Sequence, residues 1–150
     1  MNAVKKKGGV FFLYAFVWKT LSAAIRSKGE VIINVASSGI ASLLLSGCRK
    51  THLRFHIPIN LNVNSFCSIT PGNNVASLLN KANLILWDED PMMHRHCFEG
   101  VDRTLRDVIL LLDIDKPFRG KTIVFGGDFR QILLVIQRGN RSDIMQASLH

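Results

Sequence analysis

The chain has 150 residues, of which 47% are hydrophobic and 20% charged, and its 19 Lys and Arg against 11 Asp and Glu give a net charge of +8. This composition excludes a disordered or low-complexity chain and fits one globular domain with one core. The charge favours an anionic partner such as nucleic acid, although part of it lies in residues 1–7, where we expect a basic, solvated N-terminal tail.

Cysteine spacing and hydropathy limit where such a protein can work. Cys48, Cys67 and Cys97 are widely spaced and form no C-x-x-C pair, which argues against a disulfide framework and against a cysteine zinc site. No apolar stretch approaches the roughly 18 residues of a membrane span, and no signal peptide is recognisable. We therefore expect a soluble, intracellular protein of a reducing compartment, without a membrane partner.

Apolar runs and helical patterns alternate along the chain. Nearly continuous apolar runs are typical of strands buried on both faces, and four are found, at Val10–Tyr14, Val31–Val35, Asn83–Trp87 and Thr122–Phe125. Helical spacing of apolar residues predicts helices over Val17–Ser27 and from Phe98 to Leu112. This alternation predicts an α/β fold, a parallel sheet with helices on both faces whose ligands lie beyond the carboxyl ends of the strands.

The segment from Cys48 to Asn74 interrupts this alternation, because it is richer in His, Asn, Ser and Pro. We expect an irregular insertion here, with a short strand near Leu53–Ile57. Two histidines in it, His52 and His56, flank Arg54 and Phe55. They are candidates for contacts with phosphates or bases, and equally for exposed loop residues.

Acidic residues follow two of the predicted strands. The stretch LILWDEDPM ends in the adjacent acids Asp88 and Glu89, which suit a carboxylate that holds Mg²⁺ and a neighbour that activates water in phosphoryl transfer. Strand alternation is expected to send them to opposite faces. In TIVFGGDFRQIL, Gln131 follows G-G-D and could hydrogen-bond a γ-phosphate. For the two acids the alternative is a solvated strand end, and for G-G-D it is an ordinary turn.

Hydroxyl groups follow the second predicted strand, in NVASSGIASLLL. Ser37, Ser38 and Gly39 offer hydroxyls and free N–H groups at a helix start, which suits a nucleic-acid phosphate. Simple N-capping by Ser37 or Ser38 is the alternative, and both can hold together. In MMHRHCFEG, His94, His96 and Cys97 lack a distant partner pair, so local capping and packing are favoured over a metal site.

Six stretches together carry a family resemblance, namely GGVFFLY, VWKTLSAAIRSKGE, NVASSGIASLLL, RFHIPINLN, LILWDEDPMMHRHCFEGVDRTLRD and GGDFRQILLVI. From about residue 8 to residue 150 the chain resembles the Pif-family DNA helicases of superfamily 1B, particularly the branch carried by plant Helitron transposons. The resemblance implies the first RecA-like domain of a P-loop NTPase, an ATP- and Mg²⁺-dependent motor moving 5′ to 3′ on single-stranded DNA. It further implies a nuclear role in DNA repair, recombination, replication and telomere maintenance.

The resemblance also assigns roles to residues. Asp88 matches the metal-binding acid, Glu89 the carboxylate that activates water, and Gln131 the side chain that senses the γ-phosphate. The matches to DNA-contacting segments are Ser37, Ser38, Gly39, His52 and Arg54. ATP is then the one small-molecule substrate.

The chain departs from the family pattern where the phosphates would be held. Between FFLY and FVWKTL the family carries a G-x-x-x-x-G-K-[ST] loop, and here only Ala15 stands there. Lys19-Thr20 aligns with a Lys-Thr inside the following helix and does not replace the loop. Asp90 stands at an alanine position and Leu134 at a proline position, and a second RecA-like domain is not found before His150.

These departures predict a degenerate or truncated helicase with weak ATP binding, weakly active or inactive as this polypeptide. The alternatives are a non-catalytic single-stranded nucleic-acid-binding module, and a chain whose short first connection strains the core too much for a stable fold. A Rossmann dehydrogenase is the main fold-level competitor, and it is disfavoured because no G-x-G-x-x-G follows the first strand.

Overall fold

A single parallel sheet organises the chain. The computed structural model describes residues 9–13, 17–109, 115–128, 134–136 and 139–148. Five strands pair in parallel in the order β1-β5-β4-β2-β3. Their bounds are β1 Gly9–Leu13, β2 Val31–Ala36, β3 Arg49–Lys50, β4 Ala82–Asp88 and β5 Thr122–Gly126. The four strands expected from apolar runs are confirmed, together with the α/β class.

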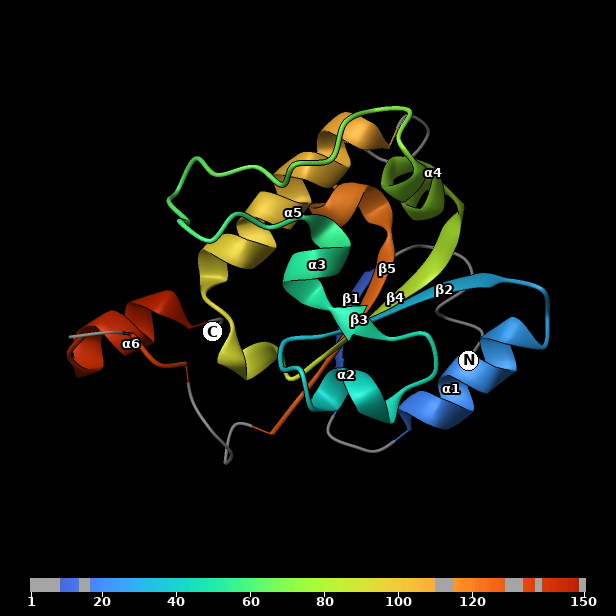
Figure 1. Cartoon of the computed structure of the whole chain (residues 1–150), viewed down its shortest axis with the longest axis horizontal. Coiled ribbons are helices and arrows are strands. Elements are labelled where there is room, and N and C mark those ends of the chain that lie inside the picture. The colour runs from blue at the N-terminus through green and yellow to red at the C-terminus, as the bar shows by residue number, and fades with distance from the viewer. Residues whose placement is uncertain (1–8, 14–16, 110–114, 129–133, 137–138, 149–150) are drawn as a thin grey trace.

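Helices cover both faces of this sheet (Figure 1). They are α1 Trp18–Arg26, α2 Ala41–Leu44, α3 Thr51–Phe55, α4 Asn74–Lys81, α5 Arg95–Val108 and α6 Arg141–Ala147, with 3₁₀ turns at Asp90–Met92 and Pro117–Gly120. In Figure 1, α1 and α2 lie on one side of the sheet, and α3, α4 and α5 lie on the other. The predicted helices after β1 and β4 are therefore confirmed, although α5 ends at Val108 and Ile109 is already extended.

Side-chain alternation along β4 explains why both faces need a cover. Leu84 and Leu86 pack with Trp18 and Ile25 of α1 in one apolar cluster. The intervening Ile85 and Trp87 belong to a larger cluster that includes the buried residues of α5. Because all four β4 side chains are buried, the strand reads as a continuous apolar run instead of an alternating one.

The strand expected near Leu53–Ile57 is wrong, because this part of the chain forms helix α3. Leu53, Phe55 and Ile57 alternate with polar residues, which is typical of a strand, but Thr51 and Phe55 stand four apart and are both buried on one helical turn. His56 ends the helix in a left-handed conformation with φ 51°. From there to α4 the predicted irregular insertion is confirmed.

Some expectations fall on residues that the structure does not describe. These are the basic tail of residues 1–7, the positions Tyr14 and Ala15, Leu112 at the end of the α5 pattern, and Gln131. Among the helices of the described ranges, none is both long and apolar enough to cross a membrane.

Candidate functional site at the carboxyl edge of the sheet

Strand register brings the polar segments together at one edge. The Cα of Asp88 at the end of β4 pairs with Ala36 of β2 and with Gly126 of β5. The segment from Ser37, the acids after Trp87 and the glycines before Asp128 therefore start at the same level of the sheet. This confirms the expected gathering of polar residues beyond the carboxyl ends of the strands.

Trp18 covers this edge from the α1 side. As the first residue of α1, it is only 7% exposed, and its indole Nε1 donates a hydrogen bond of 3.1 Å to Oδ1 of Asp88. Its ring also lies over β5, because a Cβ placed on Gly126 would stand 1.7 Å from Cζ2 of Trp18. A glycine is thus required at position 126 for the indole to lie against the carboxylate.

The three consecutive acids are held in a poorly solvated place. Burial raises the pKa of Asp88, while hydrogen bonds from the Glu89 backbone and from Trp18 lower it. Burial also raises the pKa of Glu89, and the charges of Asp88 and Asp128 raise it further. Asp90 is 3% exposed, burial raises its pKa to about 7, and its Oδ1 has no hydrogen-bond partner within the described part of the chain.

The expectation that Asp88 and Glu89 point to opposite faces of a strand is wrong. β4 ends at Asp88, and Glu89 has φ 56° and ψ 40°, which is the left-handed conformation. Asp88 keeps the parity of Leu84 and Leu86 and so meets α1, while Glu89 turns the chain toward the 3₁₀ helix Asp90–Met92. The two carboxylates are separated by this turn instead of by strand pleating.

Ser37 is tied to β4 by two hydrogen bonds. Its backbone N–H donates to the carbonyl of Asp88 at 3.0 Å, and its Oγ accepts from Nε1 of Trp87 at 3.2 Å. Trp87 is fully buried and packs with Phe98, the ring centroids being 4.7 Å apart. The Ser37 hydroxyl is therefore a fixed part of the edge. Ser38 Oγ accepts from the N–H of Ala41, the first residue of α2, at 3.1 Å, while the N-cap position of α2 itself is Ile40, which makes no side-chain cap bond.

A cationic side chain lies next to Ser37, Ser38 and Gly39, which we name the serine segment. The side chain of Lys50 lies against Gly39, with its Cε 3.7 Å from the place of a Gly39 Cβ. Arg49 and Lys50 form the exposed strand β3, and Arg54 follows one helical turn later, half-buried. We name Arg49, Lys50 and Arg54 the β3–α3 cations. With the N–H groups and hydroxyls of the serine segment, they form a surface suited to phosphates.

The histidines fall into two environments. His52 keeps much of its surface exposed. Its pKa is lowered mainly by the partial loss of water around the ring, and further by the charge of Lys50. His94 caps α5, because its Nδ1 accepts the backbone N–H of His96, and Cys97 is buried in the core. Within the described ranges no group of three His, Cys, Asp or Glu residues could hold a metal ion. Capping and packing thus explain the H-x-H-C stretch.

Comparison with known proteins places this geometry in a family. The sequence model of the PIF1-like helicases matches residues 1–150. The chain belongs to the PIF1-like helicase family. It is 28% identical over 130 residues to the ATP-dependent DNA helicase PIF4 of Trypanosoma brucei brucei, covering 84% of this chain and 16% of that protein.

Solved structures of helicases from this family share the fold. The Pif1 helicase from Bacteroides in complex with ADP-AlF3 and single-stranded DNA superimposes with a TM-score of 0.74 at 27% identity, over 97% of this chain and 34% of that one. Pif1 from Candida albicans gives a TM-score of 0.59 at 16% identity, over 86% of this chain and 30% of that one. The chain thus spans about a third or less of these relatives.

Magnesium–ATP does not fit the edge as this chain folds. Carboxylates such as Asp88 and Glu89 are donors that Mg²⁺ prefers, but the phosphate-holding half is missing. Four residues separate Leu13 of β1 from Trp18 of α1, and the indole of Trp18 lies on Asp88 and Gly126. The 150-residue sequence contains no G-x-x-x-x-G-K-[ST].

The one G-K-T tripeptide of the sequence lies at the wrong end of a strand. Gly120 and Lys121 precede β5 and Thr122 is its first residue, so the three residues stand at the amino edge of the sheet. Lys121 is buried, and its Nζ donates to the carbonyls of Asn80 and Ala82 at 2.9 and 2.8 Å. This lysine holds α4 and β4 together and is unavailable to a phosphate.

Trp18 is the functional residue that sequence reasoning missed. It lies in the predicted helix Val17–Ser27, and its ring packs with Leu84 and Leu86. Its contact with Asp88 joins residues 70 positions apart and depends on the length of the connection after β1. A shortened connection before a Trp was the available signal.

Proposed function

We propose that this chain is a degenerate form of the first RecA-like domain of a Pif1-like, ATP-dependent DNA helicase. The family activity is ATP-driven movement 5′ to 3′ on single-stranded DNA, serving DNA repair, recombination and replication in the nucleus. In the sequence, Asp88, Glu89 and Gln131 match the family's metal-binding acid, water-activating base and γ-phosphate sensor. By itself this chain has weak or no ATP turnover.

The Trp18 contact carries the proposal of weak turnover. The indole occupies the face of Asp88 and Gly126, and no phosphate-binding loop stands between β1 and α1 to move it away. Losing the loop removes several charge-assisted contacts, each worth about 1.5–3 kcal/mol, so ATP affinity falls by orders of magnitude.

ATP hydrolysis tests this proposal. Phosphate release is measured for the full chain with Mg²⁺ and saturating single-stranded DNA, with the Glu89→Gln variant as the matched control. We expect the two rates to be equal, both at the background of a blank. A turnover that Glu89→Gln abolishes would overturn the claim of inactivity and establish this chain as a working ATPase.

A second candidate function is a non-catalytic single-stranded nucleic-acid-binding module. The observation that favours it is the alignment of the β3–α3 cations with the serine segment, where Lys50 lies against Gly39 and Ser37 is fixed by Trp87. None of these contacts depends on the missing loop.

A salt titration distinguishes this module from an inert remnant. Because released counterions make affinity for phosphates fall with salt, we expect the logarithm of the binding constant for a single strand to fall linearly with the logarithm of salt concentration. Replacing Arg49 and Lys50 together by Ala should reduce the slope by about 1 to 2. Flat or absent binding contradicts the module.

A further inference from the structure

A cavity outside the carboxyl edge opens where three segments meet. It has a volume of about 610 Å³. Its described lining comes from the start of α5, from the insertion before α4 and from the segment around α6, and consists of Val63, His94, Arg95, His96, Glu99, Ile136, Asp143, Gln146 and Ala147. A volume in this range suits a small ligand of about nucleoside size.

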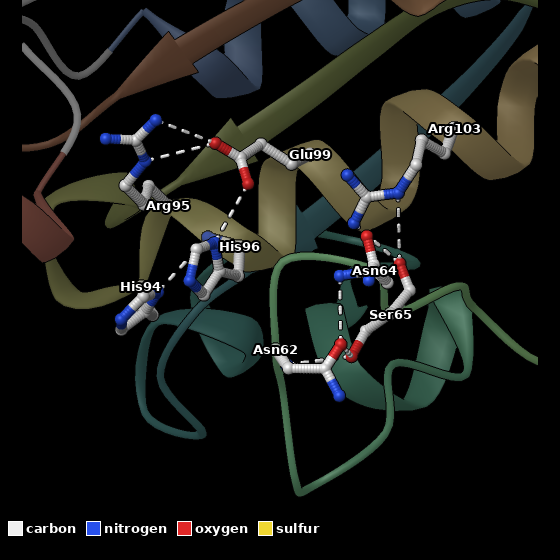
Figure 2. Close-up of polar contacts among 8 residues, drawn as sticks. All are labelled: Asn62, Asn64, Ser65, His94, Arg95, His96, Glu99 and Arg103. Carbon is white, nitrogen blue, oxygen red and sulfur yellow. Dashed lines mark hydrogen bonds and ion pairs between the residues drawn. The ribbon is translucent and has the colours of Figure 1, made fainter.

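The walls of the cavity are fixed by local hydrogen bonds. The turn that presents Val63 is closed by Asn62 N–H to Ser65 Oγ at 2.8 Å, and Arg103 of α5 donates to the carbonyl of Ser65 at 2.7 Å (Figure 2). On the other side, Asn140 and Asp143 form a capping box at the start of α6. A site made of such held segments binds without a large ordering cost.

Two neighbouring imidazoles, with their planes inclined by 37°, form the aromatic wall. The rings of His94 and His96 lie 4.4 Å apart, and Nδ1 of His96 pairs with Oε2 of Glu99 at 2.9 Å (Figure 2). Because Nδ1 of His94 accepts the N–H of His96, a neutral His94 carries its proton on Nε2. Because Nδ1 of His96 faces a carboxylate, a neutral His96 leaves Nε2 as an acceptor. The pair thus offers one donor and one acceptor.

Charge in the cavity favours a neutral ring over a phosphate. Among the lining residues that the structure describes, Arg95 is the one permanent cation, and it is paired with Glu99 at 3.0 Å. Glu99 and Asp143 add negative charge on two sides. The exposed amide of Gln146 adds a further donor and acceptor, and Val63 and Ile136 supply apolar surface.

We propose that this cavity binds one base of a single-stranded nucleic acid, stacked on the His94–His96 pair with its polar edge toward Gln146. Histidine rings stack with splayed bases, and hydrogen-bonding side chains read base edges. The inference rests on the proposed function, which supplies the single-stranded nucleic acid. The net charge of +8 attracts such a polyanion, and Glu99 and Asp143 disfavour its phosphates inside the cavity. A free nucleoside has the same chemistry and is the other source to be distinguished.

Binding of a dye-labelled oligo-dT is compared with that of a strand of equal length with abasic sites, by fluorescence anisotropy with the full chain at low salt. Stacking of one base predicts that the oligo-dT binds about five-fold more tightly or better. Val63→Trp fills the cavity and should lower this ratio at least three-fold. Ile59→Trp is the matched control, because it adds the same ring on the same insertion outside the lining, and it should leave the ratio unchanged.

Gln146→Ala tests the polar edge without touching the fold, because this side chain is exposed, with Ser142→Ala on the same helix as its control. An unchanged ratio in both Val63→Trp and Gln146→Ala, with the salt dependence intact, overturns the base site and leaves the proposed function standing. Loss of all strand binding by the unmodified chain overturns both. If thymidine shifts the His94 and His96 ring resonances in NMR while oligo-dT and the abasic strand bind equally well, the cavity binds a free nucleoside. That result would overturn the proposal that it binds a base of a nucleic-acid strand.

Discussion

At the scale of single residues, Trp18 covers Asp88 and Gly126 at the carboxyl edge. Trp18→Phe keeps an aromatic ring over Gly126 but removes the N–H that Asp88 accepts. A hydrogen bond to a charged group contributes about 1.5–3 kcal/mol, so we expect the free energy of unfolding in urea to fall by that order. Val17→Ala, at the exposed neighbouring position, should change it little. An unchanged stability of Trp18→Phe would mean that the contact has no energetic weight.

Asp90 is a second residue with a clear expectation. Its carboxyl group is buried among acids, and its Oδ1 lacks a partner within the described residues. Removing an unsatisfied buried polar group relieves a cost of about 1–3 kcal/mol, so Asp90→Ala should raise the free energy of unfolding by that order at pH 8. The control is Asp115→Ala at an exposed turn, which should stay within about 0.5 kcal/mol. Destabilisation by Asp90→Ala would show that this carboxyl group has a favourable contact.

At the scale of elements, the start of α5 titrates through its cap. Burial, and then the charge of His96, lower the pKa of His94, against the opposing charge of Glu99. The unfolded chain therefore binds the proton at a higher pH, near 6.5, than the folded chain does. Stability due to this cap is lost as pH falls from about 6.5 through the folded pKa.

The variants His94→Asn and His94→Ala separate capping from titration. Asn keeps an oxygen that accepts the N–H of His96, so unfolding in urea should show full stability at pH 8 and a shallower decline toward pH 5. Ala has no acceptor and should cost about 1 kcal/mol at pH 8. Equal pH slopes in the unmodified chain and in His94→Asn would show that His94 does not set this pH dependence.

The elements also show how far the sequence could predict the structure. Buried runs such as Leu84–Trp87 identified the strands because a parallel strand covered on both faces must be apolar throughout. The segment around Leu53 was misread because a period of two and a single buried turn look alike over five residues. The turn at Glu89 could not be foreseen, because a left-handed conformation of a glutamate is imposed by its surroundings. The shortened connection before Trp18 was visible in the sequence, but its partner Asp88, 70 positions away, could be identified only from the tertiary structure.

At the scale of the whole molecule, the sheet keeps the architecture of its family while its nucleotide edge is closed. The order β1-β5-β4-β2-β3 still brings Asp88, Gly126 and Ser37 to one level, and helices lie on both faces of the sheet (Figure 1). The sequence departs from the family pattern in the connection between β1 and α1, where only four residues stand between Leu13 and Trp18. Under the proposed function, contacts with single-stranded nucleic acid fall on β2 and β3 and contacts with ATP fall at the end of β1, so the two can be tested separately.

Thermal unfolding of the full chain measures this separation directly, because a ligand that binds only the folded chain stabilises it by RT ln(1 + [L]/Kd). At 1 mM Mg–ATP and a Kd above about 1 mM, this stabilisation stays below about 0.4 kcal/mol, so we expect no resolvable shift in Tm. A single strand at about 100 times its Kd should contribute about 2.7 kcal/mol and raise Tm by several degrees at low salt. ADP with Mg²⁺ serves as the control nucleotide. Replacing Arg49 and Lys50 together by Ala should reduce only the shift in Tm that DNA causes. A rise in Tm with Mg–ATP that Asp88→Ala abolishes would contradict the closed edge, because it requires the indole of Trp18 to leave the carboxylate.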